Sequence, residues 1–204
     1  MKISIITAAF RAEYMDRVLQ TLLNQTYKDF EWVIVNDGQE GIRQWYKEAR
    51  ESGKLDNIKA WFIDMEQQKG RFGLFARNVG VMACNYRRIL FLDDDNEFEP
   101  DHIQSLVDAE LTTGKIPFCW MFIKGKKPES TFRKIKRTGF SRQGIDLACV
   151  LYKKEFFEQY GYFRDDAQVT FDWNAIERIY NGVGGDKAFV CTGKPTLIFW
   201  HKRY

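Results

Sequence analysis

The chain contains few cysteines and histidines. Four cysteines and two histidines occur among 204 residues, and no two cysteines form a CxxC pair. This spacing gives no zinc-finger pattern, and it lacks the dense disulfide framework of small secreted domains. We therefore expect reduced thiols in a cytoplasmic protein. The cysteines are Cys84, Cys119, Cys149 and Cys191.

The sequence also lacks a long apolar run and a strong excess of charge. No stretch approaches the roughly 20 apolar residues needed to cross a bilayer. The opening segment MKISIITAAF is short and β-branched and runs directly into charged residues, so we interpret it as a strand and not as a signal peptide. A net charge of +3 does not by itself indicate a nucleic-acid partner.

The chain does have enough apolar residues for a full core. Hydrophobic residues make up 45% of it and aromatic residues 16%, which excludes a disordered chain and fits one domain at this length. In the first half, strand-like and helix-like segments alternate. Strands are expected at 3–8, 30–37, 58–64 and 88–94, and helices at 12–25, 42–53, 73–86 and 99–111. This alternation predicts an α/β fold with a Rossmann-like, mostly parallel central sheet flanked by helices.

The second half of the sequence is less regular. A strand is expected at 116–123, helices at 153–161 and 169–182, and two short strands around Pro195. Residues 124–142 carry eight Lys or Arg against one Glu, which predicts a basic loop or ribbon. This basic segment could contact an anionic acceptor, a membrane surface or nucleic acid, or it could be a solvated loop.

Polar residues follow the predicted strands at the points where the apolar runs end. They are Thr7, Asn36, Asp37, Asp64 and the run 93–95. Parallel α/β sheets bind ligands beyond the carboxyl ends of their strands. We therefore expect these residues to lie along one rim of the sheet.

The acidic run in FLDDDNEFEP raises the sharpest question. Clustered carboxylates suit a hard divalent cation such as Mg²⁺ or Mn²⁺, which keeps positions open for phosphate oxygens. Asp93 and Asp95 would share one side of an extended chain, but a turn would leave Asp94 as a candidate too. The alternative is a solvated acidic turn before a helix. Glu97 and Glu99 are expected to be helix-entry charges of this kind.

Polar residues near other predicted strand and helix ends admit two interpretations each. Asp37 could accept hydrogen bonds from a base or a ribose, or it could form an ordinary Asp-Gly turn. Lys69, Arg71 and Arg77 could meet a diphosphate, brace the acidic run or lie at the surface.

Two residues near predicted helix or strand ends, Asp172 and His201, are also candidates. Asp172 could be a helix N-cap or a general base. His201 follows an apolar strand and could be structural or a metal ligand. His102 is expected at the surface of its helix.

Taken in order along the chain, these motifs resemble family 2 glycosyltransferases, which have the GT-A fold. The segment SIITAAFRAEYMDRVLQTLLNQTYKDFEWVIVNDGQ is similar to the opening of that family, with its strand, helix and Asp-Asp-Gly-Ser turn. GLFARNVGVMAC resembles the Ala-Arg-Asn helix, ILFLDDDNEFEPDHI the Asp-x-Asp metal loop, and VTFDWN the Glu-Asp-Trp motif that carries the catalytic base. Residues 1–110 match well, and residues 111–204 match at the base motif and at the end.

The resemblance implies a metal-dependent transfer of a sugar from a nucleotide-diphosphate sugar, with UDP favoured, to an acceptor hydroxyl with inversion. Asp172 would be the general base. The donor would be bound by Thr7, Ala9, Phe10, Asp37, Arg71, Arg77, Asp93 and Asp94. The Mn²⁺ or Mg²⁺ ion would be held by Asp95, with Asp93 and His201 as further ligands. Residues 1–110 would bind the nucleotide sugar, and residues 111–204 would supply the acceptor site and the base within the same domain.

Three positions depart from the family pattern. AAFR replaces the usual Tyr-Asn after the first strand, Asn36 replaces the first Asp of the Asp-Asp pair, and Phe171 replaces the Glu before Asp172. Two other classes stay open. A sugar nucleotidyltransferase would usually carry a glycine-rich loop after its first strand, which TAAFRAEY lacks. A noncatalytic module would not need the carboxylates that this chain retains.

Overall fold

A computed structural model describes residues 1–69, 73–125, 133–141, 144–165 and 171–201. Within these residues, five strands form a first sheet in the order β3-β2-β1-β4-β8. The first four strands are parallel, and β8 is antiparallel to β4. The strands are β1 (Ile3–Ala9), β2 (Phe30–Asn36), β3 (Ala60–Asp64), β4 (Arg88–Phe91) and β8 (Tyr152–Lys153). The predicted α/β fold with a mostly parallel sheet is confirmed.

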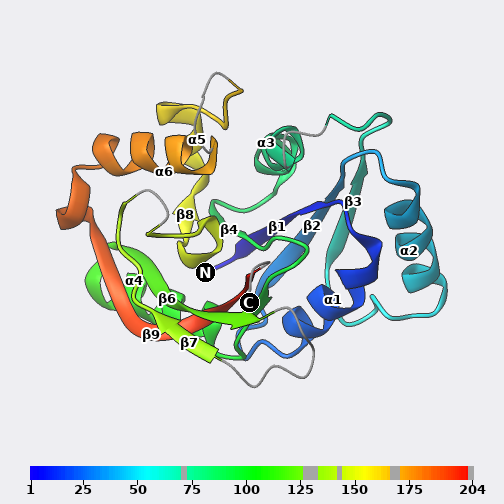
Figure 1. Ribbon diagram of the computed structural model, residues 1–204, viewed down its shortest axis with the longest axis horizontal. Coiled ribbons are helices and arrows are strands. Elements are labelled where there is room, and N and C mark those ends of the chain that lie inside the picture. The colour runs from blue at the N-terminus through cyan, green and yellow to red at the C-terminus, as the bar shows by residue number, and fades with distance from the viewer. Residues whose placement is uncertain (70–72, 126–132, 142–143, 166–170, 202–204) are drawn as a thin grey trace.

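Helices cover both faces of the first sheet. Figure 1 shows α3 (Leu74–Ala83) above the strands and α1 (Met15–Leu23) below them. A Cβ added at Gly80 of α3 would lie 2.4 Å from Ile6 Cγ2, so the missing side chain lets this helix pack closely on β1. The remaining α-helices are α2 (Glu40–Glu51), α4 (His102–Thr113), α5 (Lys154–Tyr160) and α6 (Phe171–Gly182), and the 3₁₀ turns are η1 (Ala12–Tyr14), η3 (Leu147–Cys149) and η4 (Gly185–Ala188).

The strand order reverses between β1 and β4. From β1 the chain steps outward through β2 to β3, and then returns through α3 to place β4 on the other side of β1. A crevice at such a reversal is where open α/β sheets bind ligands. The loops after β1 and β4, which begin at Phe10 and Leu92, therefore meet at the position expected for a site.

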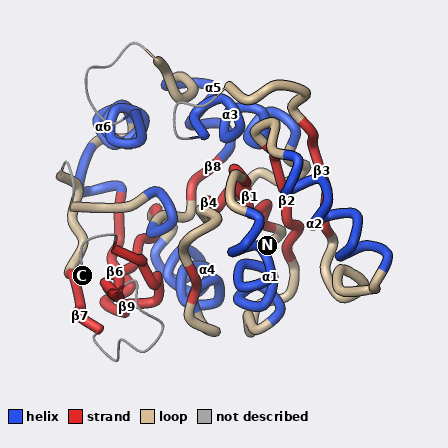
Figure 2. The backbone as a smooth tube through the Cα atoms, turned by 45° about the vertical axis from the view of Figure 1, so that its right-hand side comes forward, coloured by secondary structure: helices blue, strands red, loops and turns tan. Residues whose placement is uncertain are grey.

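A second sheet lies beside the first (Figures 1 and 2). Its order is β5-β9-β6-β7 in the part of the chain that the structure describes, with β9 parallel to β6 and the outer strands antiparallel. Its strands are β5 (Glu97–Phe98), β6 (Ile116–Gly125), β7 (Arg133–Lys136) and β9 (Phe189–His201). Helix α4 packs against β6 and β9. Each sheet contains a strand from the other half of the chain. β5, from the first half, belongs to the second sheet, and β8, from the second half, belongs to the first sheet.

The prediction of two short strands around Pro195 is wrong, because β9 is one continuous strand. Pro195 lies opposite Trp120 of β6, where the register shifts on both sides of Trp120. Proline cannot donate to a strand ladder, but an irregular position of this kind tolerates it. The basic segment 124–142 is partly the predicted ribbon, since β7 lies within it and pairs with β6; residues 126–132 and 142 lie outside the described residues.

The prediction that His102 lies at the surface of its helix is also wrong. His102 is fully buried between α4 and the second sheet. Its ring stacks on Phe98 with centroids 3.8 Å apart, and its Nδ1 lies 2.9 Å from Thr196 Oγ1. The helix presents this face to β5 and β9, and those strands come from segments that the local helical pattern does not include.

Candidate functional site

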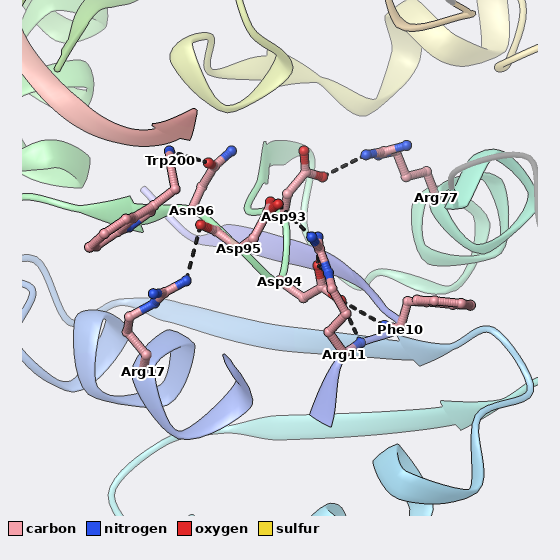
Figure 3. A network of polar contacts seen from close by, with 9 residues as sticks. All are labelled: Phe10, Arg11, Arg17, Arg77, Asp93, Asp94, Asp95, Asn96 and Trp200. Atoms are coloured by element: carbon pink, nitrogen blue, oxygen red, sulfur yellow. Dashed lines mark hydrogen bonds and ion pairs between the residues drawn. The ribbon is translucent and has the colours of Figure 1, made fainter. Parts of the chain in front are cut away.

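The acidic run bridges the reversal point between β1 and β4. Both backbone amides that follow β1, at Phe10 and Arg11, donate to Asp94 Oδ2 at 2.8 Å (Figure 3). Asp94 is buried, with 3% of its side chain exposed. Burial raises the pKa of Asp94 even though Arg11 and the two amides stabilise its charged form. The carboxylate thus links the two loops of the crevice and faces inward.

Arg11 neutralises two carboxylates of the acidic run. Its Nε donates to Asp94 Oδ1 at 3.0 Å, its Nη2 also bonds to Asp94, and its Nη1 donates to Asp95 Oδ2 at 2.6 Å. Burial alone would lower the pKa of Arg11, but Asp94 and Asp95 outweigh it and raise that pKa above its ordinary value. The sequence marked this position only as a departure from the family pattern, since the length of an arginine side chain does not show which carboxylate it will reach.

A second arginine gathers carboxylates on the other side of the loop. The buried guanidinium of Arg77, on α3, donates from Nη2 to Asp93 Oδ1 at 2.6 Å, and its Nη1 lies 3.6 Å from Asp172 Oδ1. Burial would lower the pKa of Arg77, but Asp93, Asp172 and Asp146 together raise it. Asp93, Asp146 and Asp172 thus form an acidic cluster around one permanent positive charge.

Asp172 lies in the first turn of α6, and its carboxylate is partly buried against the protein and partly exposed to solvent. Its side chain is 40% exposed, yet Oδ1 is enclosed on the side that faces Arg77. Burial raises the pKa of Asp172, Arg77 opposes that rise, and Asp93 adds to it. A raised pKa makes a carboxylate a stronger proton acceptor, and partial exposure leaves it accessible to a hydroxyl group.

Asp146 belongs to this acidic cluster and was not among the predicted site residues. It precedes η3, and its Oδ1 accepts the backbone N–H of Ala148 at 2.9 Å. Burial, with Asp93 and Asp172 close by, raises the pKa of Asp146 to about 7. The residues around Asp146 in the sequence indicate only a helix N-cap. Its nearness to the acidic run depends on how the two halves of the chain pack.

The residues predicted to hold a nucleoside lie at one end of the rim. Asp37 is buried after β2, and its Oδ1 accepts the backbone N–H of Lys69 at 2.8 Å. The turn needs Gly38, which has φ +70° and whose Cβ would lie 2.2 Å from the backbone nitrogen of Gln68. Phe10 is 47% exposed and can offer its ring to a planar base.

Two other predicted donor residues are buried in the sheet. Thr7 is fully enclosed, and its hydroxyl accepts the indole N–H of Trp32 at 2.9 Å. Ala9 is also fully buried. Neither side chain offers surface to a ligand in this conformation, so both support the rim from below. Asn36 and Asp64, the other rim residues, are hydrogen-bonded to one another at 2.8 Å.

A cavity of about 550 Å³ opens beside Asp95. Within it, the guanidinium of Arg17 lies between the rings of Tyr14 and Trp200, at 4.8 and 4.7 Å from their centroids. Arg17 also donates from Nη2 to the backbone oxygen of Asp95 at 3.2 Å (Figure 3). Three cations and two carboxylates line the cavity with these rings, which favours an anionic ligand. The lining residues are Arg11, Tyr14, Arg17, Asp95, Glu97, Lys124 and Trp200.

The prediction that Glu97 is a solvated helix-entry charge is wrong. Glu97 lies in β5, accepts the indole N–H of Trp200 at 2.7 Å, and lies 3.3 Å from Arg17 Nε. Glu99 does lie at the entrance of α4, where its backbone oxygen accepts the N–H of His102 at 3.0 Å, but its side chain is half-buried and not fully solvated.

Comparisons with known proteins identify the family and the fold of the chain. The family model described as Glycosyl transferase family 2 matches residues 4–178. The chain belongs to glycosyl transferase family 2. An uncharacterized glycosyltransferase of Nostoc sp. is 33% identical over 115 residues, which cover 55% of this chain and 34% of that protein. The chain therefore spans about a third of the length of this curated relative.

Solved structures show that the family 2 chain has the GT-A fold. S. aureus TarS 1-349 in complex with UDP-GlcNAc matches 100% of this chain and 60% of its own, with a TM-score of 0.75 and 14% identity. The mannosyltransferase PcManGT from Pyrobaculum calidifontis, in complex with GDP-Man and Mn²⁺, matches 98% of this chain and 56% of its own, with a TM-score of 0.68 and 12% identity. At these identities the likeness concerns the fold.

The carboxylate of Asp95 fits a divalent ion that would take its other ligands from a diphosphate. Among the residues that the structure describes, no three His, Cys, Asp or Glu side chains are placed so that they could hold one metal ion together. A Mg²⁺-type site needs only one or two carboxylates when the substrate supplies phosphate oxygens. Asp95 offers this chemistry at the wall of the cavity, with 21% of its side chain exposed. Arg71 and the side chain of His201 lie outside the described residues, so both assignments stay predictions.

Proposed function

We propose that this chain transfers a sugar from a nucleotide-diphosphate sugar to an acceptor hydroxyl, with UDP as the favoured nucleotide. The observation that carries the proposal is the pairing of Asp172 with Arg77 beside Asp93. It brings a candidate base with a raised pKa to the acidic run at the reversal point of the sheet. Membership of family 2 and the nucleotide-sugar complexes of TarS and PcManGT support it.

The nucleoside would lie at the end of the rim formed by Phe10 and Asp37. The exposed ring of Phe10 would cover one face of the base, and Asp37 would accept hydrogen bonds from the base. Asp93, held by Arg77, would face the ribose or the sugar. Asp94 would support this region through its bonds to the amides of Phe10 and Arg11.

The acceptor hydroxyl would attack the anomeric carbon while Asp172 takes its proton. One C–O bond forms at the anomeric carbon and the bond to the diphosphate breaks, so the nucleoside diphosphate leaves with the bonding electrons. A single displacement of this kind inverts the anomeric centre. Arg77 would fix the carboxylate of Asp172 and stabilise its ionised form until the proton arrives.

Asp95 would hold a Mn²⁺ or Mg²⁺ ion, with Asp93 and His201 as further candidate ligands. When bound, the ion would offset the negative charge that grows on the leaving diphosphate. Arg17 and Lys124 line the same cavity and would add fixed positive charge beside that diphosphate.

The two halves of the chain would divide the work. Residues 1–110 would bind the nucleotide sugar, and residues 111–204 would supply the base and the acceptor site. The basic segment 124–142 is the candidate surface for an anionic acceptor, a membrane surface or nucleic acid. Cytoplasmic location stays a prediction, consistent with the four free cysteines. No helix among the described residues has the length and apolarity to cross a membrane.

A panel of nucleotide sugars tests the proposal directly. Release of UDP or GDP is measured with each donor, with and without Mn²⁺ or Mg²⁺, for the wild type and Asp172→Asn. We expect metal-dependent release from one donor class, weakened in the variant. Release of pyrophosphate from a sugar phosphate and a nucleoside triphosphate would instead indicate a nucleotidyltransferase. Binding of a donor with no release under any condition would indicate a noncatalytic module.

A further inference from the structure

The guanidinium of Arg11 bonds to one oxygen of the carboxylate that would hold the metal. Its Nη1 lies 2.6 Å from Asp95 Oδ2. We propose that Arg11 is a displaceable counter-cation that keeps Asp95 from binding a divalent ion until the diphosphate of a donor draws the guanidinium away. This inference rests on the proposed function. It adds an order of events, in which the metal and the diphosphate bind together.

Repulsion between Arg11 and a divalent ion would weaken the binding of that ion to Asp95. Asp93, Asp94 and Asp95 bring three negative charges, and Arg77 and Arg11 return two positive ones. A divalent ion at Asp95 would face the guanidinium across a single carboxylate. Two cations that contact the same carboxylate repel each other, and this repulsion is screened only weakly because the site is partly buried. The ion therefore binds tightly only after Arg11 has moved.

Arg11 has more contacts with Asp94 than with Asp95, so it can leave Asp95 without leaving Asp94. Two of its nitrogens, Nε and Nη2, bond to the buried carboxylate of Asp94. Only Nη1 bonds to Asp95, and that carboxylate lies at the wall of the cavity. Arg11 itself is 27% exposed on the same wall. The contact with Asp94 can anchor the side chain while the contact with Asp95 is exchanged for a ligand oxygen.

A diphosphate is the ligand suited to this exchange. Its oxygens accept the N–H groups of a guanidinium as readily as a carboxylate does. Arg17 and Lys124 line the cavity and attract the same anion. Once Arg11 bonds to a phosphate oxygen, Asp95 is released to the metal. The guanidinium, which first competes with the metal, then becomes a contact of the donor.

The test measures the binding of Mn²⁺ by electron paramagnetic resonance, without any turnover. The wild type is compared with Arg11→Gln, with and without UDP. We expect the wild type to bind Mn²⁺ weakly alone and roughly tenfold or more tightly when UDP is present. Arg11→Gln is expected to bind Mn²⁺ alone roughly tenfold more tightly than the wild type, with a smaller gain from UDP.

Arg17→Gln is the matched control, since it removes the same charge from the same cavity. Arg17 contacts the backbone oxygen of Asp95 and not its carboxylate, so its loss should change the Mn²⁺ affinity less than about threefold. Arg11→Lys keeps the charge, so its affinity for Mn²⁺ alone should stay as weak as that of the wild type. Adding Asp95→Asn to Arg11→Gln should abolish the gain in Mn²⁺ affinity. Circular dichroism confirms that each variant is folded.

Equal Mn²⁺ affinity of the wild type and Arg11→Gln would overturn the proposal. An equal gain in Arg17→Gln would also overturn it, because the effect would then be one of general charge. Failure of the proposed function looks different, since no nucleotide sugar would be consumed whatever the Mn²⁺ affinities. The arms with Mn²⁺ alone therefore test Arg11 independently of the donor and the reaction.

Discussion

Arg77 Nη1 lies 3.6 Å from Asp172 Oδ1, while Nη2 of the same guanidinium donates to Asp93 at 2.6 Å. One buried cation therefore joins α3, the acidic run and the first turn of α6. The contact places the candidate base and the candidate donor site in one electrostatic unit. A change in charge at one of these residues should therefore shift the pKa values of the others.

Replacing Arg77 by Met should destabilise the fold by a few kcal/mol, because it leaves several carboxylates without their buried cation. The loss should be greater at pH 8 than at pH 5, since protonation relieves the unpaired carboxylates at the lower pH. Urea denaturation at both pH values measures the effect. Arg43→Met, which breaks the more exposed pair with Asp64, should cost much less, because solvent screens an exposed ion pair. Equal losses in the two variants would contradict the prediction.

Replacing Asp172 by Asn should lower the transfer rate by roughly 10²- to 10⁴-fold while leaving folding and UDP binding intact, because the amide cannot accept the acceptor proton. Rates and the UDP dissociation constant are measured on the same preparation. Glu177→Gln, an exposed change on the same helix, is the control and should stay near the wild type. Full transfer by Asp172→Asn would remove this residue from the mechanism.

Replacing Asp146 by Asn should flatten the pH dependence of stability. The pKa of Asp146 is about 7 in the folded protein and about 4 in an unfolded chain. Between these values the folded state binds more protons, so wild-type stability falls as pH rises from about 4 to 7. The side chain is partly exposed, so we expect a fall on the order of 2 kcal/mol.

Melting temperatures measured from pH 4 to 8 test this expectation for Asp146. Asn keeps an acceptor for the N–H of Ala148, so the turn itself should survive. Asp108→Asn, at an exposed position of α4, should follow the wild type. A variant of Asp146 with the wild-type pH dependence would show that this carboxylate does not titrate in the window.

UDP should raise the melting temperature only when Mn²⁺ or Mg²⁺ is present. At a ligand concentration about 100 times the dissociation constant, binding adds roughly 2.7 kcal/mol, which corresponds to a shift of about 5–10 °C for a chain of this size. Differential scanning fluorimetry gives the shift. Asp95→Asn should lose the effect of the metal. An equal shift with and without metal would contradict the assignment of Asp95.

The sequence predicted the rim because that part of the fold depends on local pattern. Apolar runs define the parallel strands, and their ends must share one edge of the sheet. Asp37 and the acidic run follow β2 and β4, and they lie at the same edge of the sheet as this rule requires. The helix that carries Asp172 was also visible in the sequence, although its contact with Arg77 was not.

The rest of the site depends on contacts between distant segments. Asp146 looks like a turn residue until the second half packs on the first. His102 looks like a surface residue of a helix until β5 and β9 cover it. Arg11 reaches Asp95 across 84 positions of sequence. Patterns of a few residues do not carry such information, so the electrostatics of the site came only from the structure.

The acidic run is fixed in a different sheet at each end. Leu92, just after β4, donates its N–H to Ile6 of β1 at 3.0 Å, and Glu97 of β5 pairs with Ile198 of β9. The position of the acidic run therefore depends on the docking of β9, which lies far from it in the sequence. A change that loosens β9 from β5 should disturb the candidate site even though it touches none of the three aspartates.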